Sequence, residues 1–272
     1  MDRRTVLKGA ALSLVPGVLL GRSPVASAAD GGLVMVAAGD MNRLPDARAT
    51  GSLAVAHKPQ VVATLGDQQY PSGSLSDYRS KYDSTPWGRL KSITRPVPGH
   101  HEYNTPGARG YYAYFGVRPY YAYEIGLGWR GYALNSHINI AEQASWLRQD
   151  LAAHPGMQVV ASWSDPRWSS GSHHGNAPKM QPLLDALAGR RGLVLNGHEH
   201  NYERFATRDG LRQFVVGTGG SATYGFRGTP VAGSQKRIAH VPGILVLRLR
   251  SGGSYSWAFK NKAGRTLDSG SA

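Results

Sequence analysis

The sequence predicts a single α/β domain, and three observations favour that fold class. Short apolar runs typical of buried strands alternate with stretches that have helical spacing. Such alternation indicates a sheet that is at least partly parallel, with helices packed on it. The chain has 272 residues and is 41% hydrophobic, enough for one sizeable core, and its sequence contains no Pro/Gly/Ser-rich linker and no internal repeat.

The predicted elements follow one another in a regular order. Apolar runs predict buried strands at Leu33–Ala38, Val61–Leu65, Met157–Ser162 and Leu193–Asn196. Helical spacing predicts helices at Asp46–His57, Ile140–Ala153 and Ala177–Ala188. Three further strands are predicted toward the C-terminus, at Gln213–Gly217, Gly243–Arg250 and Tyr255–Lys260. Because these three are consecutive strands, we expect them to form an antiparallel second sheet.

The N-terminal segment has the features of an export signal. Arg3-Arg4 begins a twin-arginine-type motif, an apolar stretch follows, and Ala26-Ser27-Ala28 is a small-residue cleavage site. The apolar stretch is too short to cross a membrane as a stable helix. We therefore expect residues 1–28 to be a twin-arginine-type signal peptide of a secreted or extracytoplasmic protein, without a membrane span, and residues 29–272 to form the domain. The alternative is an ordinary basic amphipathic N-terminus.

Composition narrows the possible sites and partners. The chain has no cysteine, which excludes disulfides and Cys-based zinc sites, so a metal would be held by His, Asp, Glu, Asn or Tyr. The net charge of +14 attracts polyanions such as phosphate esters. The basic residues are scattered and the sequence contains no specific nucleic-acid module, so a solvated charged surface is an equal alternative. The sequence indicates no oligomeric state.

Metal-ligand residues follow five of the predicted strands. They lie in Gly39-Asp40, Gly66–Tyr70, Pro98–Glu102 after the run Ser92–Val97, Ser164–Pro166 and Gly197–His200. Ligands of open α/β sheets bind beyond the carboxyl ends of strands, so the five loops are candidates for one shared site. Each motif is weak alone, because Gly-Asp after a strand is usually a turn. Together their carboxylates, tyrosine and imidazoles suit Fe, Mn or Zn, and a bridging carboxylate can hold two ions about 3.5–4 Å apart on a phosphoryl group.

These motifs, in this order, resemble those of the calcineurin-like metallophosphoesterases. The Gly-Asp-x-x-Tyr form of Gly66–Tyr70 and the Gly-His-x-His-x-Tyr-Glu-Arg form of Gly197–Arg204 are similar to the purple acid phosphatase branch. The resemblance covers essentially all of the chain after residue 28 and implies a double β-sandwich flanked by helices. The superfamily motif Asp-x-His reads Asp40-Met41-Asn42 here, so Tyr70 would replace the missing histidine.

The resemblance implies one or two transition metal ions, of Fe, Zn or Mn. The first ion would take Asp40, Asp67, Tyr70 and His200. Asp67 would bridge to a second ion, which would also take His198 and two further ligands.

The second site is where this sequence departs from the family. The family has Asn at the position of His100 and His at the position of Ser164. A serine hydroxyl is a poor ligand, so His100 and Asp165 are the candidates for the two missing ligands. A weakened or empty second site is the alternative, because metal binding depends on ligand number and geometry.

Three further histidines are candidates for substrate chemistry. His101 matches a family histidine beside the metals, and the placement of His173 and His174 resembles that of substrate-contacting histidines. A histidine at such a site can protonate a leaving oxygen. For His173 and His174 the alternative is a flexible polar loop with incidental imidazoles. We expect Glu102 and Glu203 to orient neighbouring groups, Arg204 among them, rather than to bind metal.

An aromatic cluster in mid-chain has two interpretations. Its members are Tyr111, Tyr112, Tyr114, Phe115, Tyr120, Tyr121 and Tyr123. A packed subdomain or hairpin is favoured because aromatic residues dominate cores. The alternative is a wall for an aromatic leaving group.

The sequence therefore predicts a secreted phosphoesterase that hydrolyses phosphate mono- or diesters by a metal-bound hydroxide. Its substrate would be a phosphorylated small molecule or a polyanion. Two alternatives remain: a metal-depleted, non-hydrolytic binding protein, and different chemistry on the same scaffold.

Overall fold

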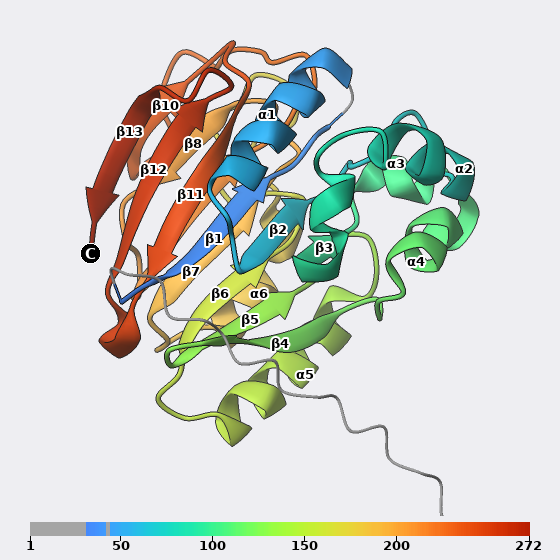
Figure 1. Ribbon diagram of the computed structural model, residues 1–272. Helices are drawn as coiled ribbons and strands as arrows, with labels where there is room; N and C mark the ends of the chain where they lie inside the picture. The colour runs from blue at the N-terminus through green and yellow to red at the C-terminus, as the bar shows by residue number, and fades with distance from the viewer. Residues whose placement is uncertain (1–30, 42–43) are drawn as a thin grey trace, which may run out of the picture.

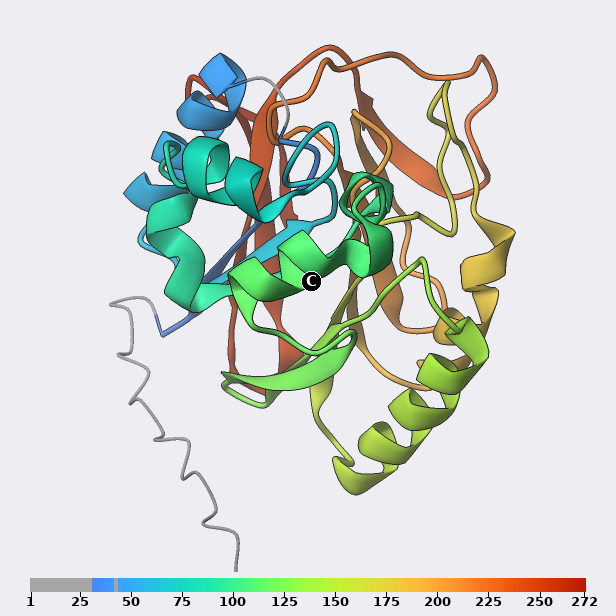
Figure 2. The ribbon, with the colours of Figure 1, turned by 90° about the vertical axis from the view of Figure 1, so that its right-hand side faces the viewer.

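Two mixed β-sheets pack face to face and helices cover the outer face of each sheet. The computed structural model describes residues 31–41 and 44–272, so the expected signal peptide and Asn42 lie outside the described residues. Figure 2 shows the layers from the side, with α1 to the left of the two sheets and α5 and α6 to the right. The double β-sandwich flanked by helices is thereby confirmed.

The first sheet has six strands in the order β13-β12-β11-β1-β2-β3 (Figure 1). Its strands are β1 (Leu33–Ala38), β2 (Val61–Leu65), β3 (Thr94–Val97), β11 (Gly243–Leu249), β12 (Tyr255–Asn261) and β13 (Thr266–Ser271). The pairs β1–β2 and β2–β3 are parallel, and the other pairs are antiparallel.

The second sheet has seven strands in the order β10-β8-β9-β7-β6-β5-β4. Its strands are β4 (Tyr121–Gly126), β5 (Trp129–Ala133), β6 (Gln158–Ser162), β7 (Gly192–Asn196), β8 (Tyr202–Phe205), β9 (Leu211–Val216) and β10 (Ser234–Ile238). The run β5-β6-β7-β9 is parallel.

The helices include two long ones and several short ones. The α-helices are α1 (Leu44–Ala56), α2 (Leu75–Asp77), α3 (His100–Tyr103), α4 (Arg109–Phe115), α5 (Ile140–Ala153) and α6 (Gln181–Ala186). A π-helical turn lies at Tyr78–Tyr82, and 3₁₀ turns lie at Gly88–Ile93, Pro106–Ala108, Pro178–Met180 and Ser251–Gly253. Within the described residues, no helix is both long and apolar enough to span a membrane.

Three apolar clusters hold these layers together. The largest lies between the sheets and joins Met35 and Leu247 of the first sheet to Leu193 and Phe214 of the second. A second cluster packs α5 and α6 on the outer face of the second sheet, and a third packs α1 and α4 on the first. Burial of this kind contributes roughly 25 cal/mol per Å² of apolar surface to the stability of the fold, so covering each sheet face with helices or with the other sheet is favourable.

The predicted elements agree with the structure except near the C-terminus. The strands Leu33–Ala38 and Val61–Leu65 and the helix Ile140–Ala153 have the predicted bounds. The expectation of a separate antiparallel sheet is wrong: β9 joins the second sheet parallel to β7, whereas β11 pairs with β1 in the first sheet and β12 pairs with β11 there. Both faces of β9 and β11 are largely buried, so their apolar patterns could not reveal which sheet each strand pairs with.

The aromatic cluster is mostly a packed subdomain, as the favoured interpretation expected. Tyr111 and Tyr114 are buried on α4, where Tyr114 stacks on Tyr78 with ring centroids 4.7 Å apart. Tyr121 and Tyr123 lie on β4, which forms a hairpin with β5. This packing fixes the short helices that surround the candidate site.

The two sheets meet where their parallel strands end. The backbone N–H of Gly39, after β1, donates to Val216 O at the end of β9, with the two atoms 2.9 Å apart. The N–H of Gly197, after β7, donates to Ser164 O at 3.1 Å. Backbone hydrogen bonds therefore tie the ligand-bearing loops to one another, the first between the two sheets and the second within the second sheet.

Candidate metal centre

Three of the predicted ligands lie in a left-handed backbone conformation directly after strands. The φ angles of Asp40, Asp67 and His198 are 63°, 51° and 69°. This region costs roughly 1–3 kcal/mol for a residue with a side chain, although Asp and His adopt it more readily than most. Such strain persists only where the surroundings fix it, and it commonly marks a functional site. Here it marks the ends of β1, β2 and β7.

Asp40, Tyr70 and His200 form the first group of ligand atoms. Asp40 Oδ1 lies 3.2 Å from Tyr70 OH and 3.2 Å from His200 Nε2, and the last two atoms are 3.4 Å apart. Two ligands about 2.1 Å from a tetrahedral ion are about 3.4 Å from each other. The three atoms are therefore spaced as ligands of one ion would be.

The neighbours of this first group fix its orientation. His200 Nδ1–H donates to Ala222 O at 3.0 Å, so Nε2 is directed into the site. Asp40 Oδ2 accepts the His198 N–H at 2.9 Å, and a Cβ built at Gly197 or Gly217 would stand only 2.8 Å from that oxygen. Glycine at both positions leaves room for the carboxylate.

His200 and Tyr70 of the first group hold their protons more strongly than usual. Burial lowers the pKa of His200, but the Asp40 carboxylate outweighs burial and raises that pKa to about 9. Burial raises the pKa of Tyr70 well above its usual value, and Asp40 and Asp67 raise it further. A metal ion bound here would have to displace these protons, as ligand deprotonation requires.

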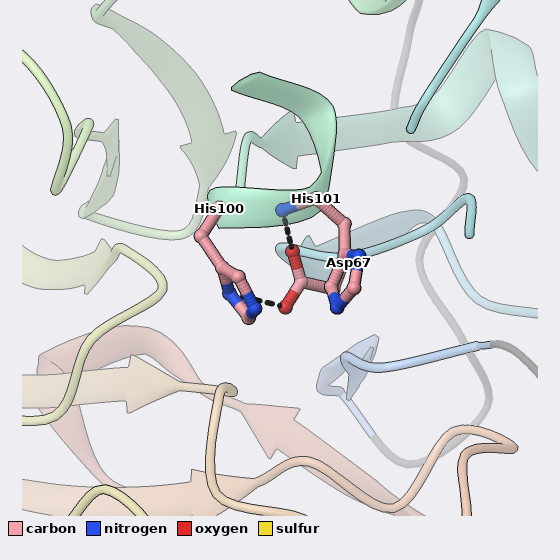
Figure 3. A group of neighbouring side chains, drawn as sticks. All are labelled: Asp67, His100 and His101. Atoms are coloured by element: carbon pink, nitrogen blue, oxygen red, sulfur yellow. Dashed lines mark hydrogen bonds and ion pairs between the residues drawn. The ribbon is translucent and has the colours of Figure 1, made fainter. Parts of the chain in front are cut away.

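Asp67 and His100 form a second group beside the first. Asp67 Oδ1 accepts the His101 N–H at 2.9 Å, and Asp67 Oδ2 lies 2.9 Å from His100 Nδ1 (Figure 3). The ligand atoms of Asp67, His100 and His101 all lie within 4.8 Å of one another. A Cβ at Gly99 would stand 2.2 Å from Asp67 Oδ1, so only glycine permits this approach.

Glu102 holds the loop of Asp67 rather than entering the site. Its buried carboxylate accepts backbone N–H groups of Asp67, Gln69 and Gly99 at 2.8, 3.1 and 2.7 Å, and the Tyr78 hydroxyl at 3.1 Å. Burial, followed by the nearby Asp67 charge, raises the pKa of Glu102 to about 8. The structure therefore supports the orienting role expected for this glutamate.

The remaining predicted histidines gather around His198. The His174 ring stacks on it with centroids 3.9 Å apart, and the His100 ring lies 5.0 Å away. His173 lies farther out, against the Tyr224 ring at 3.9 Å. Buried Glu199 accepts the His174 N–H at 2.6 Å and also the Gly175 N–H, so this segment is tied to the site.

The donor chemistry fits a second ion near Asp67. Among the described residues, several buried ligand-type atoms have no hydrogen-bond partner: Asp67 Oδ2, His100 Nδ1, His137 Nε2, Asp165 Oδ1 and His198 Nδ1. The Asp67–His100 contact is short but is not aligned as a hydrogen bond. Burial lowers the pKa of His198 to about 4, so its imidazole is neutral at pH 7, the form that binds metals.

Asp165 follows Ser164 beyond the end of β6, and it has a neighbour that the sequence did not reveal. Asp165 Oδ2 pairs with Lys179 Nζ at 2.7 Å, whereas Oδ1 lies 3.5 Å from His137 Nε2. Ser164 packs its hydroxyl against Gly66, where a Cβ would stand 2.7 Å from Oγ. His137 follows β5, a strand that was not predicted, so its place at a strand end was missed.

The chain matches no protein-family model and no curated protein sequence. Its structure is similar to purple acid phosphatase PPD1 from yellow lupin (Lupinus luteus) seeds, with a TM-score of 0.76 and 16% identity over 88% of this chain and 53% of that chain. The chain thus spans about half of that protein.

Two further solved structures are similar over nearly their whole length. GAP50, the anchor in the inner membrane complex of Plasmodium, has a TM-score of 0.67 and 14% identity, covering 88% of each chain. A dimetal phosphatase from Danio rerio has a TM-score of 0.58 and 12% identity, covering 88% of this chain and 98% of that one. These likenesses confirm the fold that the resemblance implied.

Proposed function

We propose that this chain, whose fold is that of the calcineurin-like metallophosphoesterases, is a metal-dependent phosphoesterase. The observation that carries the proposal is the pair of adjacent ligand groups at the strand ends of the two sheets. The first ion would be held by Asp40, Asp67, Tyr70 and His200. The second would be held by Asp67, His100 and His198, with assistance from Asp165. The oxygen and imidazole donors suit Fe, Zn or Mn.

The residues around the ions have separate roles. A bound ion would lower the pKa of a water molecule toward 7 and neutralise charge on the phosphoryl oxygens. His101 Nδ1–H donates to Pro71 O at 2.9 Å, and its ring packs on Tyr70, so Nε2 remains available to carry a proton to the leaving oxygen. His174 is exposed, with its ring 6.0 Å from that of His100, and would bind the phosphate group, whereas His173 would contact the rest of the substrate.

Turnover of metal-loaded protein tests the proposal. The basic chain suits phosphorylated small molecules or polyanions, so the panel should contain phosphomonoesters, nucleotides and aryl phosphodiesters. We expect hydrolysis of at least one class, lost after chelation and restored by adding Zn²⁺, Mn²⁺ or iron. A fully loaded protein that is inert on the whole panel would contradict the proposal.

The second candidate is a non-hydrolytic binding protein. Ser164 stands where a ligand is expected, and one structural neighbour, GAP50, is described as an anchor. Retained metal or phosphate-ester binding without turnover on that panel would favour this candidate. Turnover of a non-phosphate substrate alone would favour different chemistry on the same scaffold.

Tyr70 should determine the colour of the iron-loaded protein. Its hydroxyl is within 3.4 Å of both Asp40 Oδ1 and His200 Nε2, so ferric iron in the first site would bind the phenolate and show a visible charge-transfer band. We expect Tyr70→Phe to lose this band without loss of secondary structure. Tyr120→Phe, which removes a hydroxyl bonded to Glu142, is the matched control. Colour that survives Tyr70→Phe would show that Tyr70 is not a ligand.

We also propose that the protein is exported folded through the twin-arginine route. Arg3 and Arg4, together with the apolar stretch and the Ala-Ser-Ala site, support this proposal. Replacing both arginines with lysine should trap precursor in the cytoplasm of a host that has this pathway. Unchanged export of the double variant through the general secretory route would contradict it.

A further inference from the structure

The loop after β5 is held more firmly than a connecting loop requires. Asn135 exchanges two backbone hydrogen bonds with the Gln143 side chain, each at 2.8 Å. The Asn135 amide also donates to the hydroxyls of Tyr103 and Tyr112, at 2.8 and 3.1 Å, and its oxygen accepts the His137 N–H at 2.9 Å. Asn135 and Gln143 are fully buried, so these bonds fix the backbone that carries His137.

The same loop is tied to the strand end that carries Ser164. The Asp165 N–H donates to Ser136 Oγ at 3.0 Å, and Lys179 Nζ reaches both Ser136 O, at 3.1 Å, and Asp165 Oδ2, at 2.7 Å. Lys179, whose side chain is half exposed, therefore pairs with the Oδ2 atom of Asp165. The other oxygen, Oδ1, is left facing His137 Nε2.

His137 Nε2 and Asp165 Oδ1 are spaced as ligands rather than as an ordinary ion pair. They lie 3.5 Å apart, beyond a normal N–H···O distance, and neither atom has a hydrogen-bond partner among the described residues. Their side chains are only 16% and 8% exposed, so water is largely excluded. The separation is close to the roughly 3.4 Å expected between two ligands of a tetrahedral ion.

Burial and neighbouring charges act on both groups of this pair. Burial lowers the pKa of His137, and the charges acting on it are those of Asp165, Lys179, Asp67 and His100. Burial would raise the pKa of Asp165, but His198, His137 and Lys179 outweigh burial and lower it. Geometry ties the pair to the loops of the second ligand group. Ser164, which precedes Asp165, has its Oγ 2.7 Å from the position of a Cβ at Gly66, beside Asp67, and the His137 ring lies 5.3 Å from that of Tyr103, on the same short helix as His100.

We propose that His137 and Asp165 bind the second metal ion, so that the loop after β5 supplies the imidazole that position 164 lacks. The inference rests on the proposed function, because it concerns the second ion of that site. The structure has two close pairs, Asp67–His100 and His137–Asp165, and one ion held by both pairs would require rotation of their side chains toward each other. Ser164 needs no compensation at its own position, because the missing histidine is provided from a neighbouring strand end.

Metal stoichiometry tests this assignment without any use of turnover. Protein loaded with Zn²⁺ or Mn²⁺ and desalted should retain two ions per wild-type chain and about one in His137→Ala. In chelator competition, the affinity for the second ion should fall by about 100-fold or more. Mutation of residues that only hydrogen-bond to a metal ligand already lowers metal affinity by about 10–100-fold. His154→Gln, which alters a histidine paired with Asp150 on α5, should retain both ions.

A second variant and an anomalous-difference map distinguish loss of a ligand from misfolding of His137→Ala. Asp165→Asn should lose the same ion, and anomalous scattering from loaded wild-type crystals should show an ion about 2.0–2.1 Å from His137 Nε2. Unchanged second-ion affinity in His137→Ala, or one ion only per wild-type chain, would overturn the inference. A one-ion enzyme would still leave the proposed function standing, whereas two bound ions without turnover would overturn that function alone.

Discussion

Replacing Asp67 with asparagine is expected to lower phosphoester turnover by about 10³-fold or more. Asp67 belongs to the second ligand group, and its charge is the one that both ions would share under the proposed function. Loss of the bridging charge weakens the binding of both ions. The ions stabilise charge in the transition state by several kcal/mol, which corresponds to about three powers of ten in rate. Turnover and metal content, measured on the same loaded samples, check this prediction.

The substitution is chosen to spare the fold. The asparagine oxygen can still accept the His101 N–H, and the side-chain shape is kept. The change relieves the repulsion between Asp67 and Glu102 but also removes the charge beside His100, so Asp67→Asn without metal should unfold at a temperature close to that of wild type without metal. Asp185→Asn, on α6, is the matched control and should behave as wild type. Full turnover and two ions in Asp67→Asn would show that Asp67 bridges nothing.

Replacing Glu102 with alanine is expected to lower the free energy of unfolding by about 3 kcal/mol or more. Three buried backbone N–H groups, those of Asp67, Gln69 and Gly99, lose their acceptor, and each such loss costs about 1–3 kcal/mol. For a domain of this size that corresponds to a melting temperature roughly 6–12 °C lower. Thermal and denaturant unfolding of the metal-free protein measure it.

Two further variants calibrate the effect of Glu102. Glu102→Gln keeps one carbonyl oxygen for the backbone donors and should lie between wild type and Glu102→Ala. Glu124→Ala removes a glutamate whose side chain is 66% exposed and paired with Arg130, and it should cost less than about 1 kcal/mol. A change below 1 kcal/mol in Glu102→Ala would mean that the loop of Asp67 is held by other contacts.

The sequence was most informative where local pattern decides the structure. The strands Leu33–Ala38 and Val61–Leu65 are short runs, apolar except for Thr64, that are each followed by Gly-Asp, and both faces of each strand are buried. The loops after these strands carry Asp40, Asp67 and Tyr70, which the fold brings to one edge as strand-end position implies. Local pattern and long-range packing agree at these positions.

The sequence was least informative where the position of a strand in a sheet depends on pairing between distant segments of the chain. The pattern of Gly243–Leu249 predicts a strand, but its antiparallel pairing with β1 depends on contacts some 200 residues apart along the chain, which the pattern does not encode. The short strand Trp129–Ala133 contains Arg and Gly and lacks an apolar run, so it was not recognised. His137, four residues after that strand, was overlooked for the same reason.

Anomalous diffraction from crystals of the metal-loaded protein, recorded at the Fe, Zn and Mn edges, tests the central claim most directly. We predict one ion bound by Asp40, Tyr70 and His200, and a second bound by His100 and His198, with Asp67 bound to both. Loaded crystals with no anomalous peak among these residues, or with their only ions bound elsewhere on the chain, would contradict the account.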